Sequence, residues 1–489
     1  MNRQVRRIGL VVLIMFVALF TSTTIIQAVS VDHLNADPRN VRVLDDSYSA
    51  ERGQILDAEG DVLAKSVPSN DVYKYQRVYT NPELYAPVTG YFTFNQENPG
   101  IEGAMNDYLS GTANAQFLGN LSRIVTGQTP QGASVELTIE NNVQTAAYNA
   151  LGNYQGAVVA LDPKTGAILA MVSKPSYDPN TLSVHSSSAF FTAYDALLKS
   201  TTKPLVNRAV AGDLYHPGSV FKPLVASAAI DSGKATTAST YPNPAALKLP
   251  LSSTYIHNSG GTTCGGTGTP ATIGLAIQYS CNIPMAEVGA SIGESTISSY
   301  ATKFGWGKPL ALANGNFDVT PSIYPTGQDA PTVMLSSFGQ ADDRATPLQI
   351  ALDSAAIGNG GVEMQPTLIK KVIEPDLSEQ LVLKPSVYST PISSTTASAV
   401  TAMMVSSVAA GAASNATIEG IQVAGKTGTA QNGTNDPYTL WFTGFAPASD
   451  PQVVVAVVIE NGGGDGQDSV GNQIAAPIGK AVMEAVLNK

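Results

Sequence analysis

An uncharged apolar run close to the N-terminus constrains this chain more than any other feature. The run spans Ile8 to Val29, and Arg3, Arg6 and Arg7 precede it. Its 22 residues suffice for a helix that crosses a bilayer, and the arginines predict a cytoplasmic N-terminus with the rest of the chain outside. A cleaved signal peptide is the alternative, because Ile26-Gln-Ala28 could be a poor cleavage site. Because the run exceeds the apolar length usual in such peptides, we favour an uncleaved anchor in residues 1–30.

The composition excludes several classes of function. The net charge is -11, from 27 basic and 38 acidic side chains. Nucleic acid is therefore not expected as a partner, because phosphate binding needs clustered Lys and Arg. The two cysteines cannot form a four-ligand zinc site at the usual spacings, and the four histidines are scattered, so we predict no metal and no cofactor. The histidines are His33, His185, His216 and His257.

Two regions that differ in composition and residue pattern follow the apolar run. Residues 31–153 are mixed and polar with short strand-like runs, at Gly53–Asp57 and Val135–Ile139, and we predict an extended, mostly β pedestal domain there. Residues 154–489 open with two apolar runs joined by Asp162-Pro-Lys-Thr-Gly166, which is turn chemistry and predicts a buried hairpin.

The second region has helices in its middle and strands at its ends. Ala-rich segments predict helices between about residues 187 and 408, namely Lys222–Ile230, Ile273–Tyr279 and Thr346–Ile357. Strands are predicted at Ile421–Gly425, Tyr438–Ala446 and Val453–Glu460, and a closing amphipathic helix at Ala475–Leu487. The pattern predicts an α+β fold in which one sheet is assembled from remote parts of the chain.

The segment YHPGSVFKPLVASAA places a serine and a lysine on one helical face. Pro223 is tolerated only in the first helical turn, so the helix should begin near Gly218 or Ser219. Lys222 lies three residues after Ser219, where its amine can approach the serine hydroxyl and accept its proton if the amine's pKa is lowered. The spacing alone is weak evidence, because Ser200-Thr-Thr-Lys203 has it too.

Two later motifs give Ser219 its significance. Ser280-Cys-Asn282 follows it, and then Lys426-Thr-Gly428, next to Thr429. Serine-x-x-lysine, Ser-Asp-Asn and Lys-Thr-Gly in this order are the motifs of penicillin-binding proteins and class A β-lactamases. The hydroxyls of Thr427 and Thr429 can bind a carboxylate, and Gly428 would let a ligand backbone approach closely. An earlier Lys164-Thr-Gly166 is explained by turn chemistry alone.

The chain resembles the penicillin-binding proteins over nearly its whole length. Arg52-Gly-Gln-Ile-Leu-Asp57 is similar to the pedestal signature of class B members, and Gly339-Gln340 ahead of Thr346-Pro-Leu-Gln349 is similar to their penicillin-binding domain. The residues before the second region are too few for the glycosyltransferase domain of class A members. The resemblance implies an antiparallel sheet covered by helices, behind a pedestal and one transmembrane helix.

The resemblance also implies a role for each motif residue in a D,D-transpeptidase. Ser219 would attack the penultimate D-Ala carbonyl of a stem pentapeptide, and Lys222 would take its proton. Ser280 would relay a proton to the leaving amine, Asn282 would bind the substrate amide, and Lys426 would set the electrostatics. The backbone N–H groups of Ser219 and Thr429 would form the oxyanion hole.

The family also implies partners and competing activities. An acceptor amine would resolve the acyl-enzyme into a crosslink, β-lactams would acylate Ser219, and a membrane glycosyltransferase would supply the glycan strands. A D,D-carboxypeptidase would use water instead of the amine. A β-lactamase is disfavoured because no Glu-x-x-Leu-Asn follows Ser280. A non-catalytic receptor or scaffold is disfavoured because only seven residues precede the apolar run and all the motif residues are retained.

The two cysteines favour a disulfide. Cys264 and Cys281 lie 17 residues apart in a region predicted to be exported, where a bridge persists and contributes about 3 kcal/mol in the chain-entropy model. Two unpaired thiols are the alternative. Cys281 stands where the family motif has an Asp, so a bridge would tie the loop of Ser280 and Asn282 to the segment GGTTCGG and order it.

Overall fold

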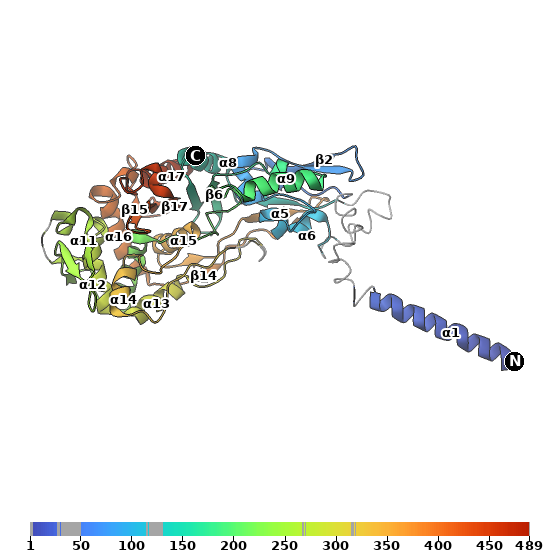
Figure 1. The fold of residues 1–489 in the computed structure, drawn as a ribbon, viewed down its shortest axis with the longest axis horizontal. Helices are drawn as coiled ribbons and strands as arrows, with labels where there is room; N and C mark the ends of the chain where they lie inside the picture. The colour runs from blue at the N-terminus through green and yellow to red at the C-terminus, as the bar shows by residue number, and fades with distance from the viewer. Residues whose placement is uncertain are drawn as a thin grey trace.

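The computed structural model describes residues 3–26, 30, 50–113, 116, 131–266, 268, 270–313, 317 and 319–488 (Figure 1). The N-terminal run forms α1 (Arg3–Thr24), a 22-residue helix with mean hydropathy 2.0 and no buried side chain. By length and composition α1 can cross a membrane, although a signal sequence passes the same test. Residues 27–29, at the alternative cleavage site, and His33 lie outside the described residues.

A five-stranded antiparallel sheet forms the centre of the second region, in the order β15-β16-β17-β5-β6. Nearly every residue of these strands is buried, so both faces of the sheet are covered. The prediction of one sheet built from both ends of the region is confirmed. The strands are β5 (Gly156–Leu161), β6 (Ile168–Lys174), β15 (Ala424–Ala430), β16 (Thr439–Ala446) and β17 (Val453–Ile459).

The pairing corrects one predicted strand. We expected Ile421–Gly425 to end just before the Lys-Thr-Gly motif, but β15 begins at Ala424 and carries the motif inside it, with Lys426 opposite Thr443 and Gly428 opposite Trp441. β15 is also an edge strand, because its only neighbour in the sheet is β16. Its free edge can therefore face a ligand.

Helices cover both faces of this sheet (Figure 1). α8 (Asn141–Leu151) and α17 (Ala475–Leu487) pack on the face that carries Val455 and Val457, while Val454 and Ala456 belong to the core beneath α15 (Pro347–Gly358) and α16 (Ser394–Ala410). Successive strand residues point to opposite faces, so β17 joins two separate cores. The predicted helices near 222–230, 273–279, 346–357 and 475–487 are confirmed.

The pedestal has a second sheet, in the order β13-β12-β4-β1-β2-β3. The described part of the predicted pedestal also contains helices, among them α4 (Pro82–Thr89), α5 (Gly100–Ala104) and α6 (Asn106–Ser110), and α8 also falls within residues 31–153. The pedestal is therefore less purely β than the sequence suggested. The strands are β1 (Ile55–Leu56), β2 (Val62–Pro68), β3 (Tyr75–Tyr79), β4 (Ser134–Leu137), β12 (Ile369–Ile373) and β13 (Glu379–Gln380). Two of them, β12 and β13, come from far beyond residue 153.

Two buried ion pairs stabilise the core of the pedestal. Glu102 is fully buried and accepts from Arg52 Nε at 2.6 Å and from Arg77 Nε at 2.7 Å. Tyr79 also donates to Glu102, at 2.9 Å. The arginine that opens the pedestal signature therefore neutralises a carboxylate that could not otherwise be buried.

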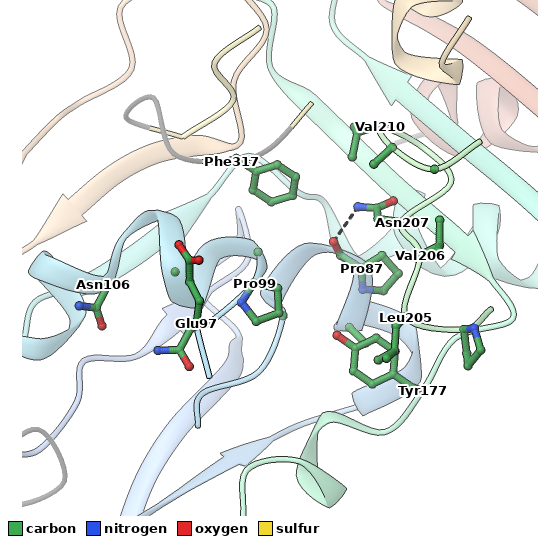
Figure 2. A pocket seen from close by; sticks show the side chains of 18 of the residues that line it. Pro87, Glu97, Pro99, Asn106, Tyr177, Leu205, Val206, Asn207, Val210 and Phe317 are labelled. Atoms are coloured by element: carbon green, nitrogen blue, oxygen red, sulfur yellow. Dashed lines mark hydrogen bonds between the residues drawn. The ribbon is translucent and has the colours of Figure 1, made fainter. Parts of the chain in front are cut away.

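A cavity of about 900 Å³ lies where the pedestal meets the second region (Figure 2). Its walls include Glu97 and Asn106 from the pedestal and Leu205 and Val206 from the other side. A hydrogen bond links the two regions here, because Asn207 Nδ2 of the second region donates to Pro87 O of the pedestal at 2.8 Å. None of the predicted site residues is among those that line the cavity.

Candidate active site

Ser219 lies in a short 3-10 turn, η4 (Gly218–Phe221), which runs directly into α10 (Lys222–Asp231). Pro223 occupies the first turn of α10, as its missing N–H requires. Helical structure therefore begins at Gly218, as predicted, but it begins as a 3-10 turn, and the α-helix itself starts only at Lys222. The Ser219 side chain is almost buried, with 9% of its residue surface exposed.

Close backbone packing holds the turn that carries Ser219. Gly218 has a φ of +54° and donates its N–H to Gly339 O at 2.8 Å. A Cβ at Gly339 would lie 2.1 Å from Gly218 O, so that position must be glycine. Trp441 Nε1 donates to His216 O at 2.9 Å, which fixes the residues before the turn to β16.

Lys222 points from the first turn of α10 towards the second motif. Its Nζ lies 2.7 Å from Ser280 O, 2.8 Å from Asn282 Oδ1 and 3.5 Å from Ser280 Oγ. Within the described residues these are its hydrogen bonds, and none joins it to Ser219 Oγ. Catalytic hydrogen bonds that are long in a free enzyme tighten when substrate binds, so the predicted Ser219 to Lys222 contact remains a prediction.

Ser280 and Asn282 flank the junction of two helices, α11 (Ile273–Gln278) and α12 (Asn282–Ile292). Ser280 has a φ of +62°, a left-handed conformation that costs about 1–3 kcal/mol for a residue with a Cβ. A disulfide joins the next residue, Cys281, to Cys264, and Cys281 N donates to Ala276 O at 2.9 Å. These links hold the backbone in a conformation that directs Ser280 to the two lysines.

Lys426 completes the cluster from β15. Its Nζ donates to Ser280 Oγ at 2.7 Å and to Thr427 O at 2.8 Å. Ser280 Oγ thus lies between two fully buried amines, that of Lys426 and that of Lys222. The three motifs, distant in sequence, meet in one hydrogen-bonded chain.

Burial decides the protonation of both amines. Burial lowers the pKa of Lys426 to about 7. Burial, and secondly the nearby charge of Lys426, lower the pKa of Lys222 well below its ordinary value. A neutral amine beside a serine at a helix start can accept a proton, which is the chemistry of nucleophilic catalysis.

Two family models match this chain, one to each of its main regions. Residues 156–484 match the penicillin binding protein transpeptidase domain, and residues 52–135 match the penicillin binding protein A dimerisation domain. The chain is a class B penicillin-binding protein. The first match contains every motif residue described above, and the second covers most of the pedestal.

Curated relatives and solved structures agree with this assignment. The chain is 38% identical over its full length to the peptidoglycan D,D-transpeptidase PbpA of Mycolicibacterium smegmatis, all of which is covered, and 38% identical to PbpA of Mycobacterium tuberculosis, of which 99% is covered. The ceftriaxone acyl-enzyme of M. tuberculosis penicillin-binding protein A superposes with a TM-score of 0.86 and 36% identity, over 91% of this chain and 100% of that one. Its penicillin G acyl-enzyme gives 0.83 and 36%, over 90% and 100%.

In this penicillin-binding protein, the two threonines of the third motif already have partners. Thr427 Oγ1 donates to Ala412 O at 2.8 Å, and Thr429 Oγ1 accepts from Gly471 N at 3.2 Å. Thr427 O accepts from Lys426 Nζ and so faces away from β16, and groups two residues apart on a strand share a direction. Thr429 N therefore also faces the free edge of β15, as an oxyanion donor would have to.

Gly428 has a packing reason to be glycine in addition to the one we expected, which stays a prediction. A Cβ there would lie 3.0 Å from the Trp441 Cβ, 3.3 Å from Pro217 O and 3.3 Å from a methyl of Val220. The missing side chain therefore lets the turn that carries Ser219 pack against β15. We had expected it to admit a ligand backbone.

The look-alike motifs lie outside the cluster. Lys164 is half-exposed in the turn between β5 and β6 and pairs with Asp450 at 2.5 Å. Lys203 is exposed and pairs with Asp213 at 2.5 Å. The sequence reasoning missed Asn258, which caps α12 from a distant loop, because a single asparagine in a polar loop carries no local signal.

Proposed function

We propose that this class B penicillin-binding protein is a peptidoglycan D,D-transpeptidase that crosslinks stem peptides through a Ser219 acyl-enzyme. The observation that carries the proposal is the buried chain Lys222–Ser280–Lys426, beside a serine at the start of a helix. The names of the relatives, which are D,D-transpeptidases and β-lactam acyl-enzymes, support it.

The first half-reaction forms the ester. Neutral Lys222 takes the proton of Ser219 Oγ as that oxygen attacks the penultimate D-Ala carbonyl. The backbone N–H groups of Ser219 and Thr429 stabilise the oxyanion, at about 3 kcal/mol for each donor. Lys222 then passes its proton through Ser280 Oγ to the leaving amine, and the terminal D-Ala departs as the carbonyl reforms.

The second half-reaction reverses these proton transfers. An amine of a neighbouring stem peptide attacks the ester carbonyl and gives its proton back, through Ser280 and Lys222, to Ser219 Oγ. A new amide joins the two peptides and the serine is regenerated. A β-lactam acylates Ser219 by the same first step, but its leaving group stays attached after ring opening.

Asn282 and Lys426 orient the substrate. Asn282 Nδ2 donates to His257 O at 3.0 Å, and its second N–H is the group that would bind the substrate amide. A protonated Lys426, with Thr427 and Thr429, would bind the terminal carboxylate of the stem peptide.

We also propose the setting in which the enzyme works. The arginines at the start of α1 and the length of the helix support a single-pass anchor with a cytoplasmic N-terminus and an extracellular catalytic domain. The crosslinked strands must be polymerised by another enzyme, so a membrane glycosyltransferase is the expected partner.

A fluorescent penicillin followed over hours on the full-length chain in detergent tests the function. We expect a stable label that mass spectrometry locates on the peptide containing Ser219, and no label on Ser219→Ala. No label on the parent would support a scaffold, and a label lost within seconds would support a β-lactamase.

A second assay separates transpeptidase from carboxypeptidase. With a stem pentapeptide and an amine acceptor, a transpeptidase yields the crosslinked amide as D-Ala is released, whereas a carboxypeptidase yields only the tetrapeptide acid. Lys426→Ala should nearly abolish acylation in either case. Its matched control is Lys164→Ala, which removes the lysine of the other Lys-Thr-Gly and should leave the rate close to that of the parent.

A further inference from the structure

The N-terminus of α12 is capped from outside its own sequence. The residue at the cap position, Cys281, offers no side-chain hydrogen bond, since its sulfur is part of the disulfide. Asn258 provides the cap instead. Its Oδ1 accepts hydrogen bonds from both Asn282 N and Ile283 N, each at 3.0 Å. These are N–H groups of the first helical turn, which have no partner within the helix.

The other end of the Asn258 amide is anchored as firmly. Its Nδ2 donates to Asn243 Oδ1 at 3.0 Å and to Pro244 O at 3.2 Å. Asn258 is only 2% exposed and Asn243 is fully buried. One end of the amide accepts and the other donates, so these contacts fix its orientation; a flipped amide would place donors against donors.

Asn243 extends the network to the disulfide. Its Nδ2 donates to Cys264 O at 3.2 Å and to Gly268 O at 2.9 Å, and its Oδ1 accepts from Cys264 N at 3.2 Å. The loop therefore reaches the second motif by two routes, one covalent through Cys281 and one through Asn258. The covalent route ends on Cys281, and the other ends on Asn282 and Ile283, so both reach the three residues that follow Ser280.

The network acts on the proposed base through Asn282. The backbone of Asn282 is held by Asn258, and its side chain is held by the neighbouring His257 O. The side-chain oxygen of Asn282, Oδ1, accepts a hydrogen bond from Lys222 Nζ at 2.8 Å. A shift of the first turn of α12 would therefore move Lys222 relative to Ser219.

We infer that Asn258 is a positioning residue for acylation: it places Asn282, and through it Lys222, and does so without bringing a charge towards the amine. The inference rests on the proposed roles of Lys222 and Ser219. Neutrality at position 258 matters because, in the described part of the chain, the groups that face Lys222 carry no negative charge. Ser280 and Asn282 are neutral, Phe338 presents its ring at 6.0 Å, and Lys426, whose pKa is about 7, is positive when protonated and neutral otherwise.

Two substitutions separate position from charge. Asn258→Ala removes the cap, and we expect the second-order rate constant for penicillin acylation, per folded molecule, to fall about 10-fold to 100-fold, as misplaced catalytic groups do. Asn258→Asp keeps a carboxylate oxygen in place of the Oδ1 that accepts both N–H groups, but it loses the Nδ2 donor and adds a negative charge. That charge favours protonated Lys222 and raises its pKa, so the acid limb of the pH–rate profile should move to higher pH.

Asn180 supplies the matched control. Its side-chain amide also both accepts from and donates to the backbone: Oδ1 accepts from Tyr79 N at 2.9 Å and Nδ2 donates to Tyr79 O at 3.2 Å. These contacts lie far from the motifs. Asn180→Ala and Asn180→Asp should lower thermal stability without changing the rate or the acid limb.

The outcomes distinguish the inference from the function on which it rests. If both Asn258 variants acylate within two-fold of the parent per folded molecule, with an unmoved acid limb, Asn258 is only structural and the inference fails. If the parent itself takes no label at Ser219, or Lys222→Ala is acylated at the parental rate, the proposed function fails instead. All rates are measured on the full-length chain, with the folded fraction fixed by circular dichroism.

Discussion

Replacing Lys426 with methionine should stabilise the protein at neutral pH while it removes activity. The amine is fully buried and its pKa falls to about 7, against about 10.4 in an unfolded chain. Between these values the unfolded state binds more protons, so stability rises with pH through this window. At about 1.4 kcal/mol for each pKa unit, burying the amine lowers the free energy of unfolding by about 4 kcal/mol at pH 7.

The hydrogen bonds of the amine offset part of this gain. Methionine leaves Ser280 Oγ and Thr427 O without their partner, which costs roughly 1 kcal/mol each. We therefore expect Lys426→Met to be about 2 kcal/mol more stable than the parent at pH 7. Near pH 10 the amine is neutral in the folded state and still about 70% protonated in the unfolded state, so its burial costs only about 0.7 kcal/mol. The lost hydrogen bonds then dominate, and the variant should be about 1 kcal/mol less stable than the parent.

Urea unfolding at the two pH values measures this change of sign. Trp306 and Trp441 are both buried in the transpeptidase domain, so their fluorescence reports its unfolding. Lys164→Met is the control, because its amine is 48% exposed and the change should stay within about 0.5 kcal/mol at both pH values. A difference between Lys426→Met and the parent that is equal at both pH values would refute the reasoning.

Three further predictions concern the same cluster. Because burial lowers the pKa of Lys222, the acylation rate in stopped-flow measurements should hold through neutral pH and fall only on the acid side; a rate that rises into the ordinary lysine range would contradict this. Replacing Cys264 and Cys281 together with serine should slow acylation about 10-fold by loosening the loop, and an unchanged rate would leave the disulfide no catalytic role. Gly428→Ala should lower the free energy of unfolding by about 1–3 kcal/mol and slow acylation, whereas Gly433→Ala, whose methyl meets only a movable exposed carboxylate, should do neither.

Local rules in the sequence predicted much of the fold. Pro223 can stand only in a first helical turn, so the helix start beside Ser219 followed from one residue. Continuous apolar runs bounded by turn residues predicted β5, β6, β16 and β17 to within about one residue. The turn at residues 162–166 accounted for the Lys-Thr-Gly copy that lies outside the site. The errors lay where partners are remote: β12 and β13 joined the pedestal sheet through pairing that their own residues do not encode.

The candidate site divides in the same way. The order and spacing of three short motifs were enough to name Ser219, Lys222, Ser280, Asn282 and Lys426, because those residue types carry the chemistry whatever surrounds them. The packing role of Gly428 is visible only with the neighbouring turn in place, and the cap by Asn258 only with its loop folded back on α12.

The sequence by itself therefore determined which groups can react: a serine, two amines, a hydroxyl relay and the Lys-Thr-Gly motif that would hold a peptide. Only the tertiary structure decided their state. A lysine amine in water is protonated at neutral pH and cannot accept a proton, whereas these two are fully buried next to each other with no carboxylate among the described residues that bond them. Desolvation is a property of the surrounding packing, and so the base arises from the fold rather than from the motif.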